Sequence, residues 1–70
     1  MKGPLKFPVV LTSPDGGWFR RVQPDGFIER KRLGMDWEPA PDGDGNPFIR
    51  IERIAGYVRT MTEKLRWKQT

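Results

Sequence analysis

The tripeptide Pro-Asp-Gly occurs three times in this chain of 70 residues, at positions 14–16, 24–26 and 41–43. In each copy the proline presets φ for a type I turn, the aspartate bonds the backbone that follows, and the glycine takes a left-handed conformation. The first two copies begin ten residues apart. Reversals this close together are typical of short antiparallel strands and leave little room for long helices.

Runs rich in β-branched and aromatic residues lie between these turns, at residues 7–12, 18–22 and 27–33. They predict three strands. The first lies at an edge or begins at Pro8, because proline cannot donate a hydrogen bond to a neighbouring strand. The second and third flank Pro-Asp-Gly and predict a β-hairpin. Residues 34–47 are an acidic connector rich in Pro and Gly, and we expect residues 35–46 of it to form a loop.

Residues 48–65 fit two structures. As strands they divide into 48–54 and 57–61 around a turn at Ala55-Gly56, and a weak echo of the sequence thirty positions earlier supports this division. As a helix they begin at Asn46-Pro47 and carry apolar residues at spacings of three and four. That stripe consists of Ile51, Ile54, Val58, Met61 and Leu65. We favour a strand for 48–54 and leave 57–67 open.

The whole chain is therefore predicted to be one small domain, residues 1–70. The expected fold class is all-β, as a small antiparallel sheet or a partly open barrel of about five strands. The alternative is an α+β fold in which a C-terminal helix replaces the last strands.

The amino-acid composition excludes several function classes. The chain has neither cysteine nor histidine, which rules out disulfides, cysteine-bound zinc, a thiol nucleophile and the commonest general base. We find no catalytic constellation, so we expect no enzyme activity and no cofactor. No apolar run approaches the roughly 20 residues of a membrane span, and the first residues lack the apolar stretch of a signal peptide. We therefore expect a cytoplasmic protein that does not bind membranes.

Positive charge is concentrated in two blocks of the chain, whose net charge is +4. Residues 18–33 carry +3 and residues 48–70 carry +4, whereas the connector 34–47 between them carries −4. A basic surface attracts polyanions such as nucleic acids, and a surface of mixed sign suits a protein partner. The charge pattern therefore leaves both classes of partner open.

The hairpin register decides which side chains share a face, because side chains alternate along a strand. A type I turn with a glycine bulge places Arg20 opposite Arg30 and Arg21 opposite Glu29. One face then carries Trp18, Arg20, Val22, Ile28, Arg30 and Arg32. The other carries Phe19, Arg21, Phe27, Glu29, Lys31 and Leu33, and we expect it to be the core side.

Two arginines in directly opposed positions destabilise a hairpin unless something compensates their charge. A phosphate backbone, the acidic connector folding back, or solvation can each do so. The first function hypothesis is thus a non-enzymatic module that binds DNA or RNA, with Trp18 stacking on a base. Its phosphate contacts would be Arg20, Arg30, Arg32, Arg50 and Arg59. The competing interpretation makes Trp18 a core residue and the arginines solvated, and a register shifted by one would pair Arg20 with Glu29.

The alternative function is a small protein-interaction module, an accessory or inhibitor that docks on a larger host protein. Its candidate contacts are Trp37, Asp42, Asp44 and Trp67. Trp67 lies among basic residues and can also pack on the fold as its last element. A third possibility is calcium binding, because Asp42, Asp44 and Asn46 have the spacing at which a calcium loop begins. Pro47 and Arg53 occupy positions where such a loop needs glycine and glutamate, so we predict no metal site.

Overall fold

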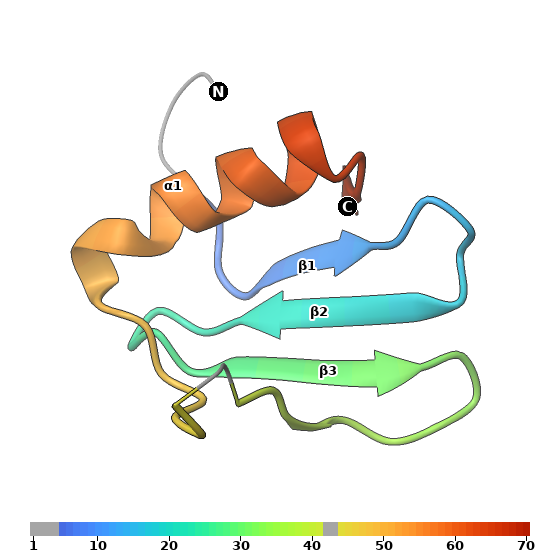
Figure 1. Ribbon diagram of the computed structural model, residues 1–70, viewed down its shortest axis with the longest axis horizontal. Helices are drawn as coiled ribbons and strands as arrows, with labels where there is room; N and C mark the ends of the chain where they lie inside the picture. The colour runs from blue at the N-terminus through green and yellow to red at the C-terminus, as the bar shows by residue number, and fades with distance from the viewer. Residues whose placement is uncertain (1–4, 42–43) are drawn as a thin grey trace.

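The computed structural model describes residues 5–41 and 44–70. Three strands form the middle of an antiparallel sheet: β1 (Val9–Thr12), β2 (Trp18–Val22) and β3 (Ile28–Arg32). Two short strands form its edges: β4 (Glu38–Pro39) and β5 (Lys68–Gln69). The strand order is β4-β3-β2-β1-β5, so the first four strands form a meander and the last returns beside the first (Figure 1).

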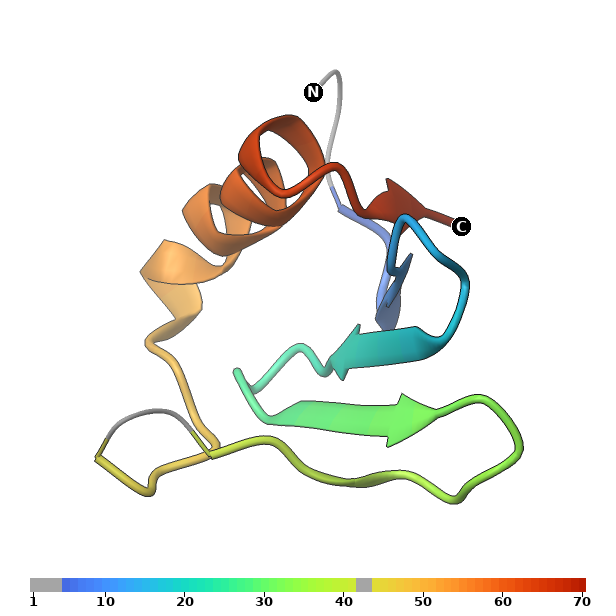
Figure 2. The same ribbon diagram turned by 45° about the vertical axis from the view of Figure 1, so that its right-hand side comes forward.

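A single helical segment connects β4 to β5. It begins as the 3-10 turn η1 (Ile51–Arg53), continues as α1 (Ile54–Arg59) and ends as the π-helical turn η2 (Thr60–Lys64). The segment lies alongside β1 on one side of the sheet, which we call the inner face (Figures 1 and 2). The described part of the chain thus forms an open five-stranded antiparallel sheet with one short C-terminal helix.

The first two Pro-Asp-Gly turns have the predicted chemistry. Gly16 and Gly26 donate their N–H groups to the carbonyls of Ser13 and Gln23, each over 2.9 Å. Both glycines have positive φ, +76° and +93°. The Asp25 carboxylate accepts the N–H of Phe27 over 3.0 Å. Asp42 and Gly43 of the third copy lie outside the described residues.

The predicted hairpin register is confirmed. Trp18 lies opposite Arg32, Arg20 opposite Arg30, and Val22 opposite Ile28. A type I turn followed by a left-handed glycine closes the hairpin with two hydrogen bonds, and this closure sets the register. In this hairpin the left-handed glycine is Gly26. The side chains that this register predicts to share a face of the hairpin therefore do share it in the folded chain.

The predicted strand at 48–54 is wrong, because the chain is helical from Ile51 onward. Of the two structures considered for 57–67, the helix is present as far as Lys64. Ile54, Val58 and Met61 are buried together, and only a helix turns residues at these spacings to one side. The ends of the predicted stripe, Ile51 and Leu65, are exposed. The helical segment begins after Arg50 rather than at Asn46-Pro47. The helix does not replace the last strand, because β5 follows it.

The prediction of which hairpin face is the core side is also wrong. Val22 and Ile28 lie on the face with the arginines, and both are buried. In register with them, β1 places Val9 and Leu11 on the same face. Three strands therefore combine their apolar side chains against the helix, whereas Leu33 on the opposite face is 68% exposed. The other members of the core are Ala40, Ile54, Val58 and Met61.

Within the two described ranges, no helix has the length and apolar character needed to cross a bilayer.

Candidate nucleic-acid interface

The inner face of the β2–β3 hairpin is divided along its length. Near the turn at residues 23–27 it is apolar and covered, through Val22 and Ile28. Toward the other end it carries three arginines and a tryptophan. We call these four residues, Trp18, Arg20, Arg30 and Arg32, the basic inner face.

Arg20 is the residue of this face that contacts the helix. Its Nη1 donates a hydrogen bond of 2.9 Å to the hydroxyl of Tyr57 in α1. The side chain is half-buried, and within residues 5–41 and 44–70 it forms no ion pair. A neutral hydroxyl orients the guanidinium without cancelling its charge. Arg20 is therefore a fixed cation that lacks a carboxylate in the described structure.

Arg30 faces Arg20 across the hairpin and has an acidic partner. Its Nε lies 2.9 Å from Oε2 of Glu38 in β4, and these side chains are 38% and 57% exposed. The acidic connector thus folds back onto the hairpin, one of the three compensations that the sequence suggested. An ion pair this exposed contributes only about 0–1 kcal/mol, so an incoming anion can replace Glu38.

Trp18 and Arg32 form the open end of the face. The Arg32 guanidinium carbon lies 5.0 Å from the centroid of the indole, within the range of a cation–π contact. Trp18 as a whole residue keeps 37% of its surface exposed. The backbone of Trp18 is anchored, because its N–H donates to Oγ of Ser13 over 3.0 Å. The aromatic ring is thus displayed from a fixed point of the backbone rather than buried.

Two of the predicted phosphate contacts lie elsewhere. Arg50 precedes the helix, next to Ile49, whose backbone contacts the turn glycine Gly26 at the far end of the hairpin from Trp18. Arg50 is largely exposed and lies 3.9 Å from Glu52. Arg59 lines a groove whose lining includes none of the residues of the basic inner face. The structure therefore brings together four of the six predicted residues.

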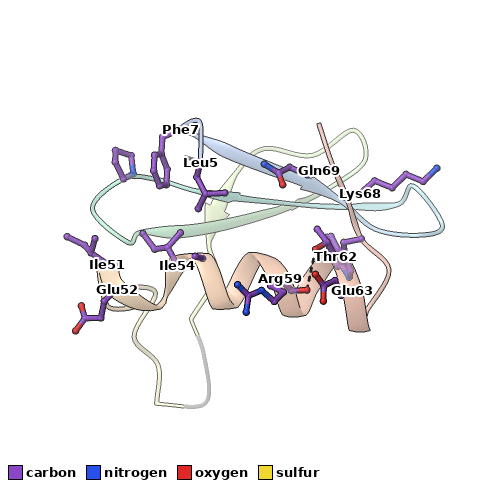
Figure 3. A pocket seen from close by; sticks show the side chains of 13 residues that line it. Leu5, Phe7, Ile51, Glu52, Ile54, Arg59, Thr62, Glu63, Lys68 and Gln69 are labelled. Atoms are coloured by element: carbon purple, nitrogen blue, oxygen red, sulfur yellow. Dashed lines mark hydrogen bonds between the residues drawn. The ribbon is translucent and has the colours of Figure 1, made fainter. Parts of the chain in front are cut away.

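The groove that contains Arg59 lies between the helix and the chain segment that leads into β1 (Figure 3). It is an open groove with a volume of about 990 Å³. Leu5 and Phe7 lie on one side, and Ile51, Ile54 and Thr62 come from the helical segment. Glu52, Glu63, Arg59 and Lys68 place two charges of each sign around it.

The residues of the alternative protein-interaction hypothesis are not gathered in one place. Trp67 lines the groove. Trp37 lies on the outer face, where the guanidinium carbon of Arg21 is 4.2 Å from the centroid of the Trp37 ring. Asp44 is in an exposed loop, where its carboxylate accepts the N–H of Asn46 over 2.9 Å. Asp42 lies outside the described residues.

Two contributors to the site were missed by the sequence analysis, Tyr57 and Glu38. Tyr57 follows the buried Ile54 by three positions and precedes Val58, so the helical alternative placed it at the border of the apolar stripe. Glu38 belonged to the connector whose folding back was one expected compensation. Neither signal specified a partner: the Tyr57 contact joins residues 37 positions apart, and the Glu38 contact depends on where β4 pairs with β3.

Comparisons with family models, curated proteins and solved structures returned no match for this chain. The chemistry of its faces is therefore the basis for a functional proposal. On that basis the basic inner face and the groove are the two candidate surfaces, and they lie on opposite sides of the helix.

The outer face carries an ion pair that links stability to pH. The Arg21 guanidinium donates two hydrogen bonds, of 2.9 and 3.0 Å, to the carboxylate of Glu29. Gln23 adds a third donor over 3.2 Å. The hydrogen bonds from Arg21 chiefly lower the pKa of Glu29 below its ordinary value of 4.5, against a smaller opposing effect of burial. The ionised carboxylate is thus favoured in the folded chain.

Acidification is therefore expected to destabilise the fold through Glu29. Because the pKa of Glu29 is depressed in the folded chain, its contribution to the free energy of unfolding is fully present above pH 4.5. That contribution is lost as the pH falls through the lower pKa of the folded chain. Thermal unfolding of the wild type should shift to lower temperature between about pH 6 and pH 3. Glu29→Gln should melt lower than wild type at the higher pH and lose less on acidification. Equal losses in both proteins would contradict this assignment.

Proposed function

We propose that this chain is a non-enzymatic nucleic-acid-binding module that contacts phosphates through its basic inner face. The observation that carries the proposal is the state of Arg20. Its half-buried guanidinium is oriented by Tyr57 over 2.9 Å, has no carboxylate within the described ranges, and lies directly opposite a second arginine. An anion between Arg20 and Arg30 would satisfy both guanidiniums and remove their mutual repulsion.

The surroundings of this pair favour a nucleic acid over a small anion. The next cross-strand pair outward is Trp18 with Arg32, which adds a third cation and an exposed aromatic ring. Phosphates recur along a nucleic-acid backbone and alternate with bases that stack on aromatic rings. A net charge of +4 would also speed association with a polyanion.

The direct test measures binding to labelled oligonucleotides, single-stranded and duplex, by fluorescence anisotropy. Each phosphate contact contributes a slope of about −0.7 to −0.9 in the logarithm of affinity against the logarithm of salt. With three contacts, from Arg20, Arg30 and Arg32, raising salt from about 50 to 200 mM should weaken binding by about 20-fold or more. Circular dichroism at both salt concentrations controls for unfolding. An affinity that does not change with salt would contradict the proposal.

The groove supports the competing proposal of protein docking, because Trp67, Phe7 and Ile51 give it apolar walls. That function predicts no oligonucleotide binding even at low salt. The anisotropy measurement therefore separates the two proposals without knowledge of the partner.

A further inference from the structure

Resting on the proposed function, we infer that the basic inner face takes single-stranded nucleic acid in preference to a duplex. One unpaired base would stack on the Trp18–Arg32 pair while the adjoining backbone phosphate lies between Arg20 and Arg30. This assignment adds a substrate class to a face whose phosphate contacts alone would fit any polyanion.

The Trp18–Arg32 pair supplies the stacking surface. The guanidinium carbon is 5.0 Å from the ring centroid, and Arg32 is exposed. Bases stack both on aromatic rings and on guanidinium planes. In a duplex the faces of the bases are already covered by their neighbours, so only a base free of its stack can use this surface. The exposed ring therefore adds affinity for an unpaired strand and none for the middle of a duplex.

The phosphate donors lie next to this stacking surface. Arg20 and Arg30 are two residues inward along β2 and β3, which corresponds to about 7 Å along the sheet. An unpaired strand can turn its bases toward the protein while its phosphates contact the neighbouring arginines. A duplex turns its bases inward and offers the protein only backbone and groove edges. Contact with both parts of the face at once therefore requires a single strand.

The width of the basic stripe also favours a single strand. Tyr57 of the helix contacts Arg20 on one side, and Glu38 of the edge strand contacts Arg30 on the other. Between them lie only β2 and β3, which are neighbouring strands about 4.8 Å apart. The major groove of a duplex alone is about 12 Å wide. The stripe is therefore matched to one backbone rather than to two.

The experiment compares four probes on the complete chain at low salt. They are a thymidine oligonucleotide of about 12 residues, a duplex of the same length, and an abasic oligonucleotide that keeps the phosphates; a uridine oligonucleotide tests RNA. We expect the single strands to bind about tenfold more tightly than the duplex and the abasic strand. Trp18→Ala should abolish this preference, whereas Trp18→Phe should retain most of it. Arg59→Gln, on the other side of the helix, should leave it unchanged.

The outcomes distinguish this inference from the function on which it rests. Equal affinity for the single strand, the duplex and the abasic strand would overturn the stacking assignment and leave phosphate binding in place. Binding of none of the probes would refute the proposed function itself. The preference is measured on the wild type, so it tests the inference even if Trp18→Ala fails to fold.

Discussion

Replacing Gly26 by alanine is expected to abolish the folded state at room temperature. A Cβ atom at this position would overlap the carbonyl oxygen of Ile49, at a separation shorter than any real contact. That oxygen cannot move away easily, because Ile49 also donates its N–H to the carbonyl of Gly26 over 3.0 Å. In addition, Gly26 has φ of +93°, which alanine adopts only at a cost. The whole domain is stabilised by only about 5 kcal/mol, and the combined strain is comparable to that.

Gly16→Ala is the matched control for this variant. Gly16 belongs to the first Pro-Asp-Gly turn and has φ of +76°, but nothing lies within 4 Å of its added Cβ. Its substitution should cost about 1 kcal/mol, or roughly 4–8 °C of melting temperature in a domain of this size. Thermal and urea unfolding followed by circular dichroism would compare the two. Similar losses in both variants would contradict the close contact between Gly26 and Ile49.

Replacing Arg20 by glutamine is expected to weaken oligonucleotide binding by at least about tenfold, because a hydrogen bond to a charged group contributes about 1.5–3 kcal/mol. The glutamine side chain ends two bonds short of the Nη1 atom that contacts the Tyr57 hydroxyl, so the variant also loses this hydrogen bond and its melting temperature is measured beside its affinity. The salt dependence should also become shallower by about 0.7 in its logarithmic slope, as expected for the loss of one phosphate contact. Anisotropy titrations at several salt concentrations measure both quantities.

Arg59→Gln is the control for the loss of one positive charge. Arg59 is exposed and lines the groove on the other side of the helix, so it should change affinity much less than Arg20→Gln. If the two variants lost equal affinity, binding would depend on net charge alone and the basic inner face would have no special role.

The sequence predicted the central hairpin well, because its register follows from local chemistry. Pro24, Asp25 and Gly26 determine the turn, and the turn determines every cross-strand pair up to Trp18 and Arg32. The segment after residue 50 was harder, because its apolar residues fit both a strand and a helix. Burial of Ile54, Val58 and Met61 in one core with residues of β1, β2 and β3 decides for the helix, and that contact exists only once the sheet has formed.

The candidate site was predictable as a set of residues on one face but not in its surroundings. Alternation placed Trp18, Arg20, Arg30 and Arg32 together. The same alternation places Val22 and Ile28 on this face, and these two apolar residues indicate that the face continues into the core. Tyr57 and Glu38 reach the arginines from the helix and from β4. Tyr57 lies 37 positions from Arg20, so its place depends on the path of the chain between them. Glu38 lies only eight positions from Arg30, but the contact depends on the pairing of β4 with β3, which no turn motif in the sequence predicted.

The inner face of the sheet carries both the hydrophobic core and the proposed binding surface. The hydrogen bond between Arg20 and Tyr57 lies at the border between them. Substitutions near this border would alter cellular abundance and ligand affinity together. A screen that scores only survival or yield would therefore confuse the two effects. Each variant of the β2–β3 hairpin needs a separate measurement of its melting temperature before any loss of binding is attributed to a missing contact.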